Sequence, residues 1–146
     1  MIRKLPQLKG KIMLDLGSAD NVKQGFVGVD FRDYGQEIIW DIRDGLPFPD
    51  NSVEEISSCH LLEHLDEEET EDLFRELYRV LKPGSVFSCR VPYATAPTAY
   101  YIGHKSFWNE NRVEVFDRDQ SGYLGHFALL QNERIGDELF FKIKKI

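Results

Sequence analysis

The sequence lacks any apolar stretch near the roughly 20 residues needed to cross a bilayer. Its first residues, MIRKLPQLKGK, also lack the apolar core of a signal peptide. We therefore expect no membrane span and a cytoplasmic protein. With 146 residues, 42% of them hydrophobic, the chain suits one globular domain that spans residues 1–146.

Cysteine and basic residues are also scarce. The two cysteines, Cys59 and Cys89, lie in apolar runs, which favours two buried reduced thiols over a disulfide or a metal site. Lys and Arg number 18 against 25 Asp and Glu, a net charge of −7. Non-specific attraction to nucleic acid or to an anionic membrane is therefore disfavoured, although a local basic groove stays open.

Short apolar runs bounded by turn residues predict five strands, at residues 12–16, 26–30, 38–41, 53–59 and 85–91. A helix is predicted over residues 66–81, where Asp66 can cap the first turn and Glu69 follows three residues later. Two further strands, at residues 125–131 and 138–144, are predicted to form a closing hairpin joined through residues 132–137. The five earlier strands could form one parallel sheet.

The segment from residue 11 to residue 30 is the most informative. One apolar run ends in Asp15-Leu16-Gly17 and the next ends in Asp30, the layout of a nucleoside pocket in a parallel α/β sheet. Ser-Ala-Asp follows Gly17, so the glycine fingerprint that cradles a pyrophosphate is missing. Carboxylates at Asp15 and Asp20 instead suit the cationic amino acid end of S-adenosylmethionine.

The segment from residue 41 to residue 92 strongly resembles the class I S-adenosylmethionine-dependent methyltransferases, and more narrowly the methyltransferase type-11 group. The resemblance rests on motifs that occur in the family's order. They are Asp41 at a strand end, Leu46-Pro47-Phe48, Glu63-His64 and Arg79-Val80-Leu81-Lys82-Pro83-Gly84. With the opening segment, the resemblance covers about residues 11 to 92.

The resemblance implies a Rossmann-like α/β fold. Its sheet is mostly parallel and seven-stranded, with helices on both faces and the last strand inserted antiparallel beside the fifth. Only residues 18–25 separate Gly17 from the second strand, too few at about 1.5 Å per residue for a helix that spans the sheet and returns. The first helix is therefore expected to be shortened or absent.

The resemblance also implies the cofactor contacts. Asp15 and Gly17 would frame the methionine end, Asp30 would hold the ribose diol, and Asp41 would face the adenine amino group. The end of the fourth strand would lie near the sulfonium. The predicted contacts are Asp15, Gly17, Ser18, Asp30, Phe31, Asp41, Ile42, Ser58, Cys59 and His60.

Residues 92–123 are rich in aromatics and form the candidate acceptor region, although they could equally close a small core. Two residues of this region are candidates for catalysis. His104 could take a proton from an acceptor, because histidine titrates near neutrality. The alternative, a histidine that bonds a loop carbonyl, is favoured. Tyr93 directly follows the fifth strand and could border the transfer site or serve only as a rim aromatic.

His60-Leu-Leu-Glu63-His64 formally matches a zinc-hydrolase pattern, His-x-x-Glu-His. We predict no metal, because this run lies between a strand and a helix start and no third ligand is evident. His64 is instead read as a packed histidine.

The sequence thus predicts an S-adenosylmethionine-dependent methyltransferase with an unidentified acceptor. The alternative is a non-catalytic S-adenosylmethionine-binding or regulatory module, which the shortened glycine loop suggests. The family's covering N-terminal helices are not seen in this sequence, so a homodimer or a lid-supplying partner is the expected protein partner.

Overall fold

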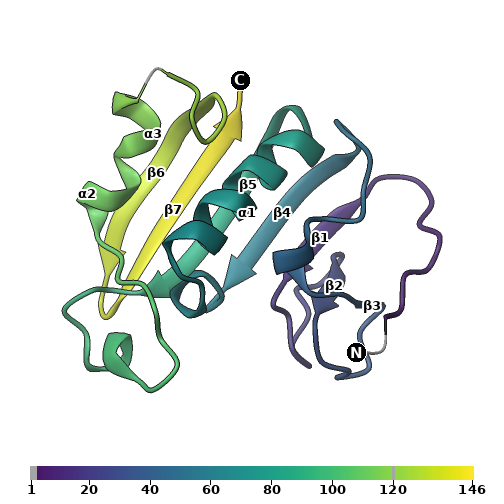
Figure 1. Cartoon of the computed structure of the whole chain (residues 1–146), viewed down its shortest axis with the longest axis horizontal. Coiled ribbons are helices and arrows are strands. Elements are labelled where there is room, and N and C mark those ends of the chain that lie inside the picture. Colours follow the sequence, from purple (N-terminus) through teal and green to yellow (C-terminus); the bar gives the residue numbers. More distant parts are fainter. Residues whose placement is uncertain (1–2, 120) are drawn as a thin grey trace.

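A sheet of seven strands forms the centre of the computed structural model, which describes residues 3–119 and 121–146 (Figure 1). The strands are β1 (Met13–Leu16), β2 (Val27–Asp30), β3 (Ile38–Ile39), β4 (Val53–Cys59), β5 (Leu81–Pro92), β6 (Phe127–Ile135) and β7 (Glu138–Lys145). They lie in the order β3-β2-β1-β4-β5-β7-β6. The first five strands in this order, from β3 through β2, β1 and β4 to β5, pair in parallel. Strand β7 pairs antiparallel with both β5 and β6. The predicted fold class is confirmed.

The one long helix, α1 (Glu67–Val80), begins where its sequence predicts. The Asp66 carboxylate accepts the Glu69 N–H at 2.8 Å, and the Glu69 carboxylate accepts the Asp66 N–H at 3.0 Å. This reciprocal pair satisfies two of the backbone donors that a helix start leaves free. Leu73, Phe74 and Leu77 form the buried stripe of the helix.

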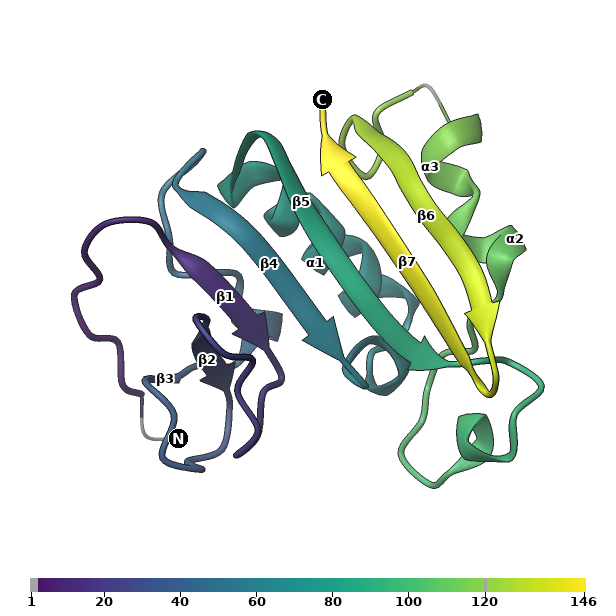
Figure 2. The same cartoon turned by 180° about the vertical axis from the view of Figure 1, so that it is seen from behind.

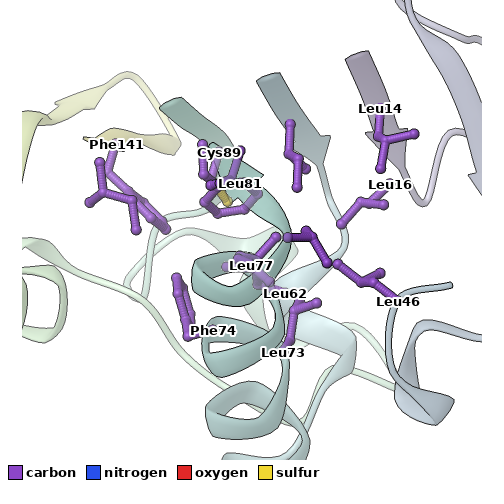
Figure 3. Close-up of a cluster of buried hydrophobic side chains, with 14 of the residues drawn as sticks. Leu14, Leu16, Leu46, Leu62, Leu73, Phe74, Leu77, Leu81, Cys89 and Phe141 are labelled. Carbon is purple, nitrogen blue, oxygen red and sulfur yellow. The ribbon is translucent and has the colours of Figure 1, made fainter. Parts of the chain in front are cut away.

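That stripe packs against one face of the sheet and forms the main core. Figure 3 shows Phe74 and Leu77 of α1 close to Leu81 and Cys89 of β5 and to Phe141 of β7. Full burial of one such Leu or Phe side chain contributes about 1.5–3 kcal/mol. The core therefore fixes α1 across β4 and β5 and holds the carboxyl ends of these strands in place.

The α-helices all lie on this same face, as far as the described residues go (Figures 1 and 2). Besides α1 they are α2 (Glu110–Val113) and α3 (Val115–Arg118), and the 3-10 turns are η1 (Ile42–Asp44), η2 (Leu62–His64) and η3 (Pro97–Tyr100). The ring of Phe116 in α3 lies 5.0 Å from that of Phe74 in α1. The expectation of helices on both faces is therefore wrong.

The sequence explains why helices cover only one face of the sheet. The described residues between β1 and β2, and between β2 and β3, form turns and no helix. This confirms that the first helix is absent. The open face is correspondingly polar, with Ser57 of β4, Ser88 of β5 and Lys142 of β7 paired in one row across it. Parallel strands usually have both faces covered and apolar, so this face is adapted to water.

The loop after β1 packs directly on β2 where a helix is missing. A Cβ added to Gly28 would lie 2.6 Å from a Val22 methyl carbon and 2.8 Å from the Ser18 hydroxyl oxygen. Such distances are too short for real atoms. Glycine at this position is therefore required for the loop to lie flat on the strand.

The closing hairpin is longer and tighter than predicted. β6 runs to Ile135, and only Gly136 and Asp137 separate it from β7. Both cysteines are free, with Cys89 buried and Cys59 half-buried beside Arg90. The expectation that both would be buried holds for Cys89 alone. Among the described residues, no helix has the length and apolar character to span a membrane.

Candidate functional site

A cavity of about 380 Å³ lies where the chain leaves the carboxyl ends of β1, β2, β3 and β4. Ligands of open α/β sheets bind at this edge, and the volume is within the roughly 300–1,000 Å³ usual for small-molecule sites. The residues that line it are Gly17, Val29, Asp30, Phe31, Arg32, Tyr34, Trp40, Asp41, Ile42, Arg43, His60, Leu61, His64 and Leu65.

Asp30 is the buried carboxylate of the cavity and ends β2. Its Oδ2 atom accepts the Ala19 N–H at 3.0 Å, and its Oδ1 atom accepts the Arg32 N–H at 3.1 Å. Each carboxylate oxygen has about two acceptor sites. Both oxygens therefore keep the capacity to accept a hydroxyl from a ligand.

Gly17 brings the loop after β1 to the floor of the cavity. Its φ of +67° is one that L side chains rarely adopt. A Cβ here would lie 3.0 Å from the Leu61 Cδ1 atom, which tightens an already close approach. Glycine at position 17 therefore allows the end of β1 and the segment after β4 to lie close together at the cavity.

Asp41 and Arg43 form the opposite rim. Asp41 caps η1 through the Arg43 N–H, and the Arg43 guanidinium lies 2.7 Å from the Asp41 Oδ2 atom. This hydrogen bond, outweighing partial burial, holds the pKa of Asp41 below its ordinary value. Asp41 is therefore an ionised acceptor beside the half-buried Ile42.

His60 follows β4, and its ring interacts with two carboxylates and one thiol. Its Nδ1 atom lies 3.2 Å from the Glu63 Oε2 atom, and its Nε2 atom lies 2.8 Å from the Glu138 Oε1 atom. Cys59 and then Glu63 raise the pKa of His60 to about 10. Burial alone would raise the pKa of Cys59, but His60 and Arg90 outweigh it and lower that pKa. The His60 ring is thus held as a cation at the cavity wall.

The other predicted contacts lie elsewhere. Asp15, Ser58 and Cys59 line a second hollow of about 720 Å³ on the open face of the sheet. Asp15 accepts the Lys23 N–H at 2.8 Å, and burial raises its pKa above the ordinary value. Ser18 is buried beneath the loop after β1. The structure therefore gathers six predicted contacts at the first cavity: Gly17, Asp30, Phe31, Asp41, Ile42 and His60.

The aromatic segment divides between core and surface. Trp108 is buried and stacks on Phe141 at 5.8 Å, whereas Tyr100 and Phe107 are exposed with their rings 5.0 Å apart. The Tyr93 hydroxyl donates to Glu110 at 2.9 Å, which raises the Tyr93 pKa. Tyr93 does not line the cavity.

His104, from this same segment, does not line the cavity but contacts a residue that does. Its ring lies 4.7 Å from the ring of His64, which lines the cavity. Sequence reasoning missed His64, Leu61 and Leu65 as lining residues. The available signal was their position directly after the fourth strand, beside the predicted His60.

Comparison with known proteins identifies the family of the chain. The model of the type-11 family described as "Methyltransferase domain" matches residues 12–89, more than half of the chain. The protein therefore belongs to this methyltransferase family, which confirms the predicted family and its cofactor, S-adenosylmethionine. No curated protein matches the sequence significantly.

Solved structures share the fold at low identity. A complex between the Trm112 methyltransferase activator of Haloferax volcanii and a candidate methyltransferase matches with a TM-score of 0.69 and 18% identity, over 95% of this chain and 83% of that one. An S-adenosylmethionine-dependent methyltransferase from Archaeoglobus fulgidus matches with a TM-score of 0.70 and 17% identity, over 92% and 86%.

Phosphoethanolamine N-methyltransferase 2 of Haemonchus contortus, in complex with S-adenosyl-L-methionine, matches with a TM-score of 0.69 and 16% identity. That match covers 96% of this chain but 50% of the other. These likenesses establish a shared architecture, in which the cavity of this chain lies at the edge of the sheet where ligands bind.

Proposed function

We propose that the protein transfers the methyl group of S-adenosylmethionine to an acceptor that enters the cavity beside His64. The observation that carries this proposal is the buried Asp30 carboxylate at the tip of β2, inside the cavity and opposite the Asp41 rim. A carboxylate in this place suits the two hydroxyls of a ribose.

The remaining cavity residues fit the other parts of the cofactor. Phe31 and Ile42 offer apolar surface for an adenine ring, and Asp41 offers an acceptor for its amino group. Gly17 leaves room for the methionine end to approach the backbone. Asp15, Ser18, Ser58 and Cys59, which lie outside the cavity wall, are proposed to support the loop after β1 and the end of β4 rather than to contact the cofactor directly.

Little further chemistry is required of the chain. Bound S-adenosylmethionine supplies an already activated methyl group, so the protein has to align the acceptor with it and exclude water. Where the acceptor carries a proton, His104 is the candidate to take it, because its ring contacts that of His64, which lines the cavity. Tyr93, bonded to Glu110, is a less suitable candidate.

A partner is proposed to cover the cavity. Among the described helices, only the short turns η1 and η2 contribute residues to the cavity wall, and the similar Haloferax structure is a complex with a methyltransferase activator. A homodimer or a lid-supplying protein would serve the same purpose, in the cytoplasm. The second candidate function, a binding or regulatory module without transfer, is favoured by the turns that replace the first helix.

Calorimetric titration with S-adenosylmethionine and S-adenosylhomocysteine tests the cofactor site. We expect micromolar binding that Asp30→Ala weakens by about 1.5–3 kcal/mol, the value of a charge-assisted hydrogen bond. Asp33→Ala, on the exposed loop after β2, is the matched control and should bind normally. Equal binding by wild type and Asp30→Ala would refute the ribose assignment.

A second measurement separates the two functions. Wild type is incubated with labelled S-adenosylmethionine and pools of small molecules, proteins and RNA, and S-adenosylhomocysteine is measured. Acceptor-dependent product identifies an enzyme. Tight cofactor binding with no product from any pool, alone or with added cell extract, identifies the binding module.

A further inference from the structure

Three side chains able to bind a metal converge beside the cavity. Glu63 and His64 belong to η2, and His104 comes from the aromatic segment. Each offers a ligand atom, and these atoms lie within 4.8 Å of one another. Two ligands of one Zn²⁺ ion in a tetrahedral site lie about 3.4 Å apart, since each bond is about 2.1 Å long. The three ligand atoms must therefore move closer together to bind an ion, and His64, the most exposed of the three residues, has the most room to move.

One oxygen of the buried Glu63 carboxylate lacks a hydrogen-bond partner among the described residues. Its side chain is 1% exposed, and its Oε1 atom accepts no hydrogen bond from any described residue. The other oxygen, Oε2, lies 3.2 Å from His60 Nδ1. Leaving a buried carboxylate oxygen unsatisfied is costly. An ion at this position would satisfy it.

The hydrogen bond of His104 leaves its other ring nitrogen available as a ligand. Its Nδ1 atom lies 3.2 Å from the Ala99 carbonyl oxygen, and only a protonated Nδ1 can bond a carbonyl. The lone pair of neutral His104 is therefore on Nε2. Metal-binding histidines commonly donate their other ring N–H to a backbone carbonyl in this way. The His64 ring lies across it at an interplanar angle of 86°, so the two imidazoles do not stack.

The two segments that carry these ligands are fastened together. The Lys105 and Ser106 N–H groups donate to the Glu63 carbonyl at 2.7 and 3.2 Å. The Ser106 hydroxyl donates to the Leu62 carbonyl at 2.8 Å. The cluster therefore rests on backbone hydrogen bonds rather than on chance proximity of mobile side chains, which is what a preorganised site requires.

We propose that Glu63, His64 and His104 bind one divalent first-row transition-metal ion. Two imidazoles and one carboxylate suit Zn²⁺, Co²⁺ or Fe²⁺, whereas Mg²⁺ and Ca²⁺ prefer oxygen ligands alone. The sequence predicted no metal because the His60–His64 run lies between a strand and a helix start and no third ligand was evident. In the structure His60 instead bonds Glu63 and Glu138, and the third ligand comes from the distant His104.

The position of the ion indicates a class of acceptor. Three protein ligands leave at least one coordination position open, and His64 lines the cavity. On the proposed function, this position holds an acceptor through a hydroxyl, carboxylate or phosphate oxygen. Because the ion would use the Nε2 lone pair of His104, His104 would not then take a proton from the acceptor. The metal site itself follows from the three ligands and does not depend on methyl transfer.

The test uses untagged full-length protein and no S-adenosylmethionine. Zn²⁺ binding is measured by calorimetry, and Co²⁺ binding by visible absorption. We expect one equivalent of each ion, with affinity lowered at least about 10-fold in His64→Ala and in His104→Ala. His126→Ala, an exposed histidine against Tyr78, is the matched control and should bind as wild type does.

Glu63→Gln completes the test, because it keeps the size of the side chain but weakens it as a ligand. Circular dichroism first establishes that each variant is folded. His64→Ala is expected to disturb folding least, because His64 is exposed. Absent binding in wild type, or equal affinity in wild type and His64→Ala, would overturn the proposal. Neither result depends on whether S-adenosylmethionine binds.

Discussion

The carboxylate of Asp30 accepts the backbone N–H of Ala19 at 3.0 Å, so the end of β2 holds the loop that follows β1. The same carboxylate accepts the Arg32 N–H at 3.1 Å. The residue predicted to bind a ribose therefore also fixes the two backbone segments on either side of it. Cofactor affinity and local stability are coupled at this position.

Asp30→Ala is expected to lower the free energy of unfolding of the free protein by about 1.5–3 kcal/mol, because two backbone donors lose a charged acceptor. Urea unfolding without ligand measures this. Asp33→Ala, whose carboxylate accepts only the exposed Gly35 N–H among the described contacts, should change stability by much less. Equal stability of Asp30→Ala and wild type would show that Asp30 serves the ligand alone.

Asp15 leads to a prediction about how stability depends on pH. The sign of this dependence is opposite to that of the usual acidic residue. Burial raises its pKa above the ordinary 3.8, although Lys23 lowers it in part. Between the ordinary and the raised pKa the folded state binds more protons than the unfolded state, so stability falls as pH rises. Asp15→Asn cannot ionise, and its amide oxygen can still accept the Lys23 N–H.

We therefore expect Asp15→Asn to gain stability relative to wild type as pH rises from the ordinary pKa toward neutrality. Urea unfolding of both proteins at several pH values gives the difference directly. Asp20→Asn, an exposed residue of the same loop, controls for the change in net charge. A difference that stays constant with pH would contradict this account of Asp15.

Local signals in the sequence were sufficient for some elements and misleading for others. β4 has its predicted bounds, and α1 begins after Asp66 as predicted, because turn residues and a capping pair mark their ends. β6 continues four residues past its predicted end at 131, to Ile135. Asn, Glu and Arg in an edge strand have the composition of a loop, since one side of the strand faces water.

The site was predictable where it follows strand ends and not where it depends on loop conformation. Asp30 and Asp41 each follow an apolar run, so their place at the sheet edge could be inferred. The approach of His104 to His64 is set by backbone hydrogen bonds from Lys105 to Glu63. No periodicity or spacing in the sequence indicates that contact.

Gly28 tests whether the loop after β1 replaces the missing helix as a packing element. A Cβ at this position would lie 2.6 Å from the Val22 Cγ2 atom and 3.0 Å from the Gln36 Cβ atom. Gly28→Ala must therefore displace the loop, and overpacking of this kind costs about 1–3 kcal/mol. We expect that loss in urea unfolding, together with weaker S-adenosylmethionine binding, because Gly17 lies at the start of the same loop.

A double-mutant cycle with Val22→Ala separates steric conflict from a general defect of β2. Val22→Ala removes the methyl group closest to the added Cβ, so Gly28→Ala should cost less in that background than in wild type. Rescue will be partial, because the Ser18 hydroxyl lies 2.8 Å from the same Cβ position. If the effects of the two substitutions on the free energy of unfolding are strictly additive, the loop does not pack tightly on β2. The short connection then only joins β1 to β2 and does not replace the helix as a packing element.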